Sequence, residues 1–114
     1  MKHVVQASET EKIHYPGIEV SAYSSGDDFA SASTIVVAGS HDRIHSTVSD
    51  RIYFVMKGSG WFEIDGESRP VALEDVIFLP QGTVYAYGGD MRLFLVHSPG
   101  FQGGTDVRSA PDGE

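Results

Sequence analysis

Residues 39–89 constrain the fold more than any other part of the chain, because short apolar runs there alternate with glycine and proline. Residues 51–57 are β-branched and aromatic, as in a strand. Asp65-Gly66 is the strongest short signal for a β-hairpin. Gly58-Ser59-Gly60 and Gly88-Gly89-Asp90 are also predicted to turn the chain. Closely spaced short strands with such turns predict an all-β sandwich or barrel.

The flanking segments fit the same class of fold. Residues 18–23 alternate apolar and polar side chains, which is strand periodicity, and residues 29–38 form a second expected strand. Residues 39–50 are polar and hold two of the five histidines. After Pro99 the chain is rich in glycine, so residues 100–114 are expected to be a flexible tail. The 114 residues are interpreted as one domain (1–114) with a core at about residues 18–99.

Composition argues against several classes of protein. The formal net charge is −8 and no cluster of Lys and Arg occurs, which argues against binding of nucleic acid. The chain has no cysteine, so disulfides, thiolate zinc sites and a cysteine nucleophile are excluded. No apolar run approaches the roughly 18 residues of a membrane span, and the N-terminus lacks the apolar core of a signal peptide. We therefore expect a cytoplasmic protein with no nucleic-acid partner and no membrane partner.

Two spaced motifs carry a resemblance to a known superfamily. The first runs Gly39, five residues, His45, one residue, Thr47, three residues, Arg51, six residues, Gly58. The second runs Glu74, five residues, Pro80, one residue, Gly82, two residues, Tyr85, three residues, Gly89. These spacings resemble the two motifs of the cupin superfamily. The resemblance implies a cupin-like antiparallel jelly-roll β-barrel.

The resemblance also implies where a metal would bind, and most of those positions have changed. In cupins two His and a Glu of the first motif and a His of the second bind a divalent metal. The corresponding positions here are His45, Thr47, Arg51 and Tyr85. A guanidinium stays protonated and cannot coordinate a metal, so we predict no usual metal and no cofactor.

An unusual metal site is the alternative, with His41, His45 and His97 as ligands together with Asp42. Residues four apart on a strand lie roughly 13 Å from each other, too far to share one ion. His41 and His45 could therefore share a metal only if residues 39–50 form a bent loop.

The inward-facing positions implied by the resemblance suggest a polar pocket. Arg51, Tyr53 and Val55 would face the barrel interior, because alternate strand residues share a face. We assign His45, Tyr53 and Tyr85 as catalytic acid–base groups. We assign ligand binding to Arg51, which can hold an anion, and to Thr47, Tyr87 and His97. A surface ion pair would account for Arg51 equally well, and strand packing would account for the tyrosines.

Three functions remain open on this reading. The first is a metal-independent isomerase, epimerase, lyase or cyclase that acts on a small polar or anionic molecule. The second is a non-catalytic module that binds or senses such a ligand, and the third is a metalloenzyme with the unusual ligand set. The resemblance further implies a homodimer, and the outward apolar residues Ile52, Phe54 and Met56 are consistent with a covered outer face.

Overall fold

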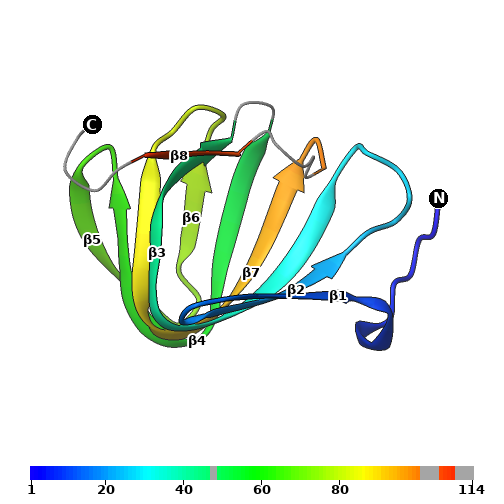
Figure 1. Ribbon diagram of the computed structural model, residues 1–114, viewed down its shortest axis with the longest axis horizontal. Coiled ribbons are helices and arrows are strands. Elements are labelled where there is room, and N and C mark those ends of the chain that lie inside the picture. Colours follow the sequence, from blue (N-terminus) through cyan, green and yellow to red (C-terminus); the bar gives the residue numbers. More distant parts are fainter. Residues whose placement is uncertain (47–48, 101–105, 110–114) are drawn as a thin grey trace.

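The computed structural model describes residues 1–46, 49–100 and 106–109, and these are almost entirely β-sheet (Figure 1). Every strand pairing is antiparallel. The elements are a single 3₁₀ turn, η1 (Ala7–Glu9), and the strands β1 (Glu11–Tyr15), β2 (Ile18–Tyr23), β3 (Ser31–Ser46), β4 (Asp50–Ile64), β5 (Glu67–Ala72), β6 (Val76–Leu79), β7 (Tyr85–Ser98) and β8 (Asp106–Ser109).

The sheet runs in the order β1-β2-β3-β7-β4-β5, with β6 paired to β4 and β8 paired to β3. The long strands β3, β4 and β7 curve sharply, so the two halves of the sheet face each other (Figure 1). The inner faces form the core, and the predicted cupin-like antiparallel jelly-roll barrel is confirmed.

Glycines stand side by side where the long strands bend. Gly39 of β3, Gly89 of β7 and Gly60 of β4 occupy one row of the sheet. A Cβ on Gly60 would lie 2.1 Å from the carbonyl oxygen of Gly88, and one on Gly89 would lie 2.5 Å from the Cα of Gly60. Only glycine allows backbones to approach this closely.

The turns predicted at Gly58-Ser59-Gly60 and Gly88-Gly89-Asp90 are therefore wrong, because β4 and β7 continue through both segments. The polar segment at residues 39–50 is also strand over most of its length, because β3 continues to Ser46. In each case the backbone pairs with a strand that is distant in the sequence.

The hairpin prediction at Asp65-Gly66 is confirmed. Both residues have positive φ, 51° and 84°, as the turn that joins twisted antiparallel strands requires. At the other end of the chain, Asp106–Ser109 forms β8 beside β3 within the expected flexible tail. Residues 101–105 and 110–114 of that tail lie outside the described residues.

The alternation of inward-facing side chains along β4 shifts by one residue partway along the strand. Arg51, Tyr53 and Val55 are buried, but beyond a register irregularity between Val55 and Lys57 the buried residue is Phe62. The irregularity is consistent with a β-bulge, which inserts a residue and shifts the alternation by one. One strand thus supplies Arg51, Tyr53 and, beyond the irregularity, Phe62 to the barrel interior, where the rings of Tyr53 and Phe62 contact each other.

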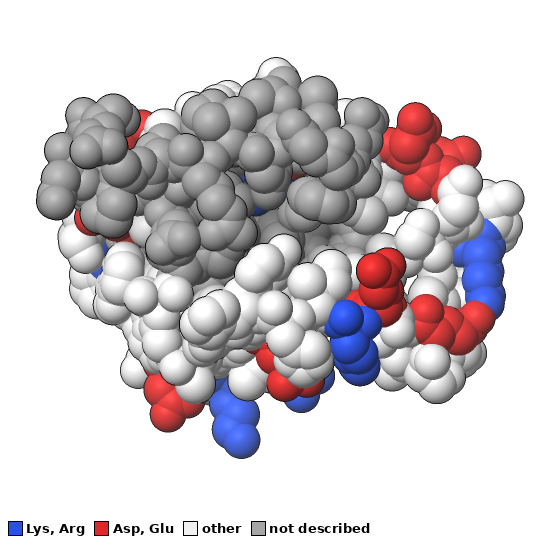
Figure 2. Space-filling model, in the orientation of Figure 1, with Lys and Arg blue, Asp and Glu red and all other residues white. Residues whose placement is uncertain are grey.

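The face of the molecule shown in Figure 2 carries acidic and basic side chains interspersed around its described part, with no continuous basic stripe there. Within the described residues, no helix is long and apolar enough to cross a membrane.

Candidate functional site

A cavity of about 360 Å³ opens between the two halves of the barrel. The strands β1, β2 and β3 form one wall, and β4 and β7 form the other. Its polar lining includes Arg51, Tyr53, Tyr87 and His97. Four of the seven residues predicted to form the site therefore meet in one cavity, whose volume suits a small organic molecule.

Three polar side chains form a row across the inner face of the sheet. His97 of β7 stands opposite Ser31 of β3 on one side and opposite Arg51 of β4 on the other. Directly opposite residues of an antiparallel pair have Cβ atoms roughly 5 Å apart and share a face. Arg51 is 3% exposed and His97 7%, so the polar row lies inside the barrel rather than on its surface.

Arg51 begins a hydrogen-bonded series of side chains. Its Nη1 donates to the hydroxyl oxygen of Tyr85 at 2.6 Å, and the Tyr85 and Tyr53 hydroxyls lie 2.7 Å apart, where either can donate. Tyr53 is in turn hydrogen-bonded to Tyr87. The series runs from a permanent cation to two phenols on the cavity wall.

Aromatic packing fixes these phenols in place. Tyr53, Phe62, Tyr85 and Tyr87 contact one another with ring centroids 5.1–6.4 Å apart, and each is 2% exposed or less. The Cζ of Arg51 lies 5.9 Å from the centre of the Tyr85 ring, which adds a cation–π contact. Hydroxyls held in this way are pre-positioned donors.

Burial raises the pKa of Tyr53 well above its ordinary value, and the neighbouring Tyr85 and Tyr87 raise it further, whereas Arg51 lowers it. Burial likewise raises the pKa of Tyr87 far above its ordinary value, with Tyr85 adding to the effect. The hydrogen bond with Tyr53 and the charge of Arg51 partly offset that rise. Both phenols are therefore neutral at physiological pH and can donate a proton or a hydrogen bond.

The remaining predicted residues are placed differently. Tyr85 is buried behind the cavity wall, where it links Arg51 to Tyr53. Thr47 lies outside the described residues. His45 belongs to β3, where its backbone is opposite Val107, but its side chain lies outside the description.

A register shift separates the two histidines of β3. His41 is opposite Tyr87 and Ile44 is opposite Tyr85, so β3 carries one extra residue between these pairs. Simple alternation along residues 41–45 therefore does not hold. By register, His41 and not His45 is the histidine paired with a tyrosine of the cavity.

The sequence analysis missed the wall formed by β1. Glu11, Ile13 and Tyr15 all line the cavity, and Ser33 lines it from β3. Glu11, Ile13 and Tyr15 alternate with Lys12 and His14, and Tyr15-Pro16-Gly17 is a turn signal, so strand periodicity could have found this wall.

The described residues contain no group of three His, Asp or Glu side chains that could hold a metal ion. The side chains of His41, Asp42 and His45, on which the unusual metal site depends, lie outside the description. At one of the four positions that the resemblance assigns to metal ligands, Arg51 places a guanidinium whose Nη1 donates a hydrogen bond to Tyr85.

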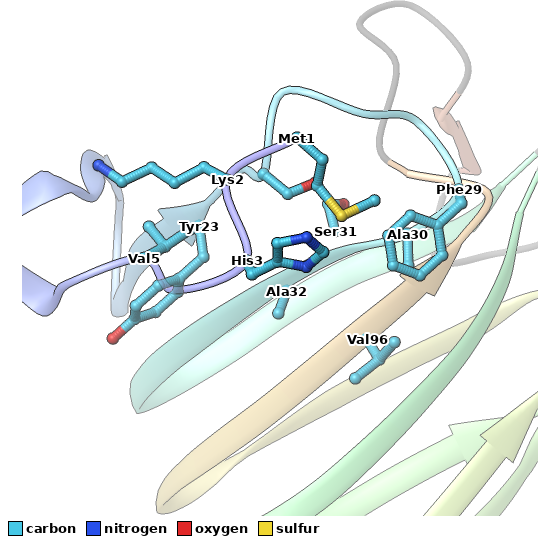
Figure 3. Close-up of a pocket in the computed structure, with 11 residues that line it drawn as sticks. Met1, Lys2, His3, Val5, Tyr23, Phe29, Ala30, Ser31, Ala32 and Val96 are labelled. Carbon is cyan, nitrogen blue, oxygen red and sulfur yellow. The ribbon is translucent and has the colours of Figure 1, made fainter.

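A second cavity, of about 260 Å³, lies beneath the N-terminal segment (Figure 3). It is lined mainly by apolar groups such as Val5, Phe29 and Val96, with His3 among them (Figure 3). The Arg51–Tyr85–Tyr53 series does not reach it, so the cavity lined by Arg51 and Tyr53 is the candidate site.

The fold and the cavity define a cupin-type β-barrel with a tyrosine–arginine interior. No protein-family model matches the chain, and no curated protein matches it. Among solved structures it is similar to Pac13, described as a unique nucleoside dehydratase, with 25% identity and a TM-score of 0.88 over 96% of this chain and 92% of that one. A Streptomyces Pac13 variant with uridine, in which a histidine is replaced by glutamine, gives 24% identity and a TM-score of 0.89 over 96% and 92% of the chains. KdgF from Halomonas sp. gives 20% identity and a TM-score of 0.69 over 81% and 88%.

Proposed function

We propose that the cavity binds a nucleoside or a similar small polar molecule and that the protein removes water from it by acid–base chemistry without a metal. The observation that carries the proposal is the buried series from Arg51 through Tyr85 and Tyr53 to Tyr87. It ends in neutral phenols on a cavity wall, and an arginine occupies one of the usual metal-ligand positions.

The Pac13 variants support the choice of tyrosines. Two of them, each with uridine, replace a tyrosine by phenylalanine, and those two tyrosines are 34 residues apart. Tyr53 and Tyr87 are separated by the same 34 residues and share one cavity here. This separation favours Tyr53 and Tyr87 as the functional pair, with Tyr85 as their link to Arg51.

The same comparison bears on the histidine. The histidine replaced in a third Pac13 variant precedes the first of those tyrosines by 13 residues. His41 precedes Tyr53 by 12 residues and stands opposite Tyr87, whereas His45 precedes it by 8. We assign His41 as the general base in place of His45.

In the proposed elimination, His41 takes a proton from a carbon next to the one that bears the leaving hydroxyl. The electron pair of that C–H bond forms the carbon–carbon double bond while the C–O bond breaks. The hydroxyl leaves as water after receiving a proton from Tyr53 or Tyr87. Burial raises the pKa of both phenols, and the charge of Arg51 offsets part of that rise, so Arg51 makes this proton transfer easier than it would be without the cation.

The polar row of Ser31, His97 and Arg51 has a binding role in this proposal. It offers hydroxyl, imidazole and guanidinium groups to the polar or anionic end of the ligand. The apolar wall formed by Ile13, Val20 and Ile35 covers the opposite end.

Mass spectrometry tests the proposed reaction. Protein dialysed against EDTA is incubated with a panel of nucleosides and their oxidised derivatives, and products that have lost one water are sought. We expect turnover by the wild type and a loss of about 100-fold or more in Tyr53→Phe, Tyr87→Phe and His41→Gln. Glu19→Gln, on the outer side of β2, is the matched control. Turnover that persists in all three variants contradicts the assignment, and binding without turnover supports a sensing module instead.

We also propose that a second copy of the chain covers the outer apolar face, defined as Val36, Ile52, Phe54, Met56, Val76, Phe78 and Phe94. The strand register joins these side chains into one surface, since Phe54 is opposite both Phe94 and Val76, and Ile52 is opposite Phe78. Phe78 is 70% exposed. A continuous apolar surface is unusual on a monomer, and in an isologous dimer the same face of each copy covers the other.

A further inference from the structure

Glu11 is a carboxylate on the cavity wall that the proposed chemistry does not use. It begins β1, the strand at one edge of the sheet. It stands opposite Ala22 of β2, which stands opposite Ser33 of β3. Glu11 and Ser33 both line the cavity.

The carboxylate of Glu11 is available to a ligand. Within the part of the chain that the structure describes, it takes part in no hydrogen bond and no ion pair. Among the described residues that line the cavity, it is the only acidic side chain, and Arg51 is the only arginine or lysine. The cavity is therefore polarised, with a cation on the β4 wall and an anion on the β1 wall.

This arrangement determines which ligand group can lie beside β1. An ionised carboxylate offers acceptors only, so it attracts N–H and O–H donors and repels carbonyl oxygens. Next to Glu11 the wall is formed by Ile13 and Val20, which suit the face of a flat ring. A ring that packs there presents its edge to the carboxylate.

We propose that Glu11 selects ligands whose ring carries an amino donor, so that an aminopyrimidine nucleoside is preferred over its carbonyl counterpart. This inference rests on the proposed nucleoside function and names the kind of base that the cavity takes. With the sugar at the polar row near Arg51, the base reaches Glu11 across the cavity.

Cytidine and uridine are the probes, because cytidine carries an amino group at the ring position where uridine carries a carbonyl oxygen. The adjacent ring nitrogen bears a hydrogen only in uridine, so the dimethylated probe described below isolates the amino group. Isothermal titration calorimetry measures both affinities for the wild type, for Glu11→Gln and for the matched control Glu19→Gln. Glu19 lies on β2 with its side chain exposed and lines no described cavity. We expect the wild type and the control to bind cytidine about tenfold more tightly than uridine, as the gain of one charged hydrogen bond predicts.

In Glu11→Gln the preference should fall to about twofold or less, because the glutamine amide pairs with an amino group or a carbonyl oxygen equally well. N4,N4-dimethylcytidine, which has no donor at that position, should lose the tenfold advantage with the wild type, and this result needs no variant. Equal wild-type affinities for cytidine and uridine, or an unchanged preference in Glu11→Gln, would overturn the inference and leave the proposed function intact. If neither nucleoside binds the wild type, both the proposed function and the inference are wrong.

Discussion

Arg51 shows how the replacement of one residue type changes the chemistry available to this fold. A metal at the base of a cupin cavity supplies a localised positive charge, and here a buried guanidinium supplies it. The difference is that Arg51 transmits its charge through hydroxyl groups, first to Tyr85 and then to Tyr53. Tyrosine hydroxyls can give up protons, so the cation acts on groups that can take part in proton transfer.

Alternation along β4 places Arg51, Tyr53 and Val55 on one face, the resemblance implied that this face is the inner one, and the structure buries all three. The sequence could not separate the position of Tyr85 from that of Tyr87, because both are inward residues of β7. Their difference arises from the bend of the sheet, which places Tyr87 on the cavity and Tyr85 behind it.

The raised pKa values predict how stability depends on pH. An unfolded tyrosine ionises near its ordinary pKa of 10.0, whereas Tyr53 and Tyr87 remain protonated in the fold at that pH. The unfolded state then binds fewer protons, so the free energy of unfolding falls as pH rises above about 10. Thermal denaturation from pH 8 to pH 11 should show a shallower fall in Tm for Tyr53→Phe than for the wild type. Tyr23→Phe, which leaves Tyr53 and Tyr87 in place, is the control and should behave as the wild type, and equal slopes for all three would contradict the burial effect.

Removal of the Tyr85 hydroxyl tests the hydrogen bond that joins Arg51 to Tyr85. Tyr85→Phe keeps the ring that packs on Phe62 and Tyr87, but it leaves the Arg51 donor without its acceptor in a buried position. We expect a loss of about 1–3 kcal/mol in the free energy of unfolding, measured with urea. Stability equal to that of the wild type would show that the hydrogen bond contributes nothing.

At the scale of elements, the long bent strands were the hardest feature to predict. Glycine pairs at residues 58–60 and 88–89 are typical of turns in a local sequence pattern. Here they allow two paired strands to lie unusually close to each other. The bend depends on the pairing of Gly39, Gly60 and Gly89 in one row of the sheet. Because these residues are far apart in the sequence, a local pattern does not reveal the bend. The register shift near His41 also limited the sequence prediction, because strand alternation counted from His45 does not continue through the shift. The hairpin at Asp65-Gly66 was predictable since its geometry depends on those two residues alone.

Gly60 offers a direct test of the bend. In Gly60→Ala the new Cβ would lie 2.1 Å from a backbone oxygen, so the strands must separate. We expect the free energy of unfolding to fall by about 2 kcal/mol or more. Gly100→Ala is the control, because its Cβ would meet neighbours only at 3.4–3.5 Å. If Gly60→Ala is as stable as Gly100→Ala, the close approach does not constrain the bend.

At the scale of the whole molecule, the fold class could be predicted from the sequence, because turn residues and motif spacing both indicate a small jelly roll. The cavity could be predicted only in part, since six of its sixteen described lining residues come from β1 and β2, outside the two motifs. The outer apolar face follows from β4, whose run from Ile52 to Met56 is hydrophobic on both sides of the sheet. Such a strand is typical of a sheet covered on both faces.

The proposed dimer gives the prediction at this scale. Light scattering after gel filtration should give twice the 12.3 kDa chain mass for the wild type. Ile52→Lys combined with Phe78→Lys should give the monomer, because two charges would then be buried in the interface. Leu73→Lys, an exposed apolar residue outside the defined face, is the control and should remain a dimer. A monomeric wild type would contradict this interface.

The central claim is that a nucleoside lies against the buried tyrosines. A crystal structure of the wild-type protein soaked with uridine or cytidine tests it most directly. We predict the nucleoside inside the barrel, with a sugar oxygen within hydrogen-bond distance of the Tyr53 or Tyr87 hydroxyl. A nucleoside bound elsewhere on the protein, or an empty barrel at saturating nucleoside, would contradict the claim.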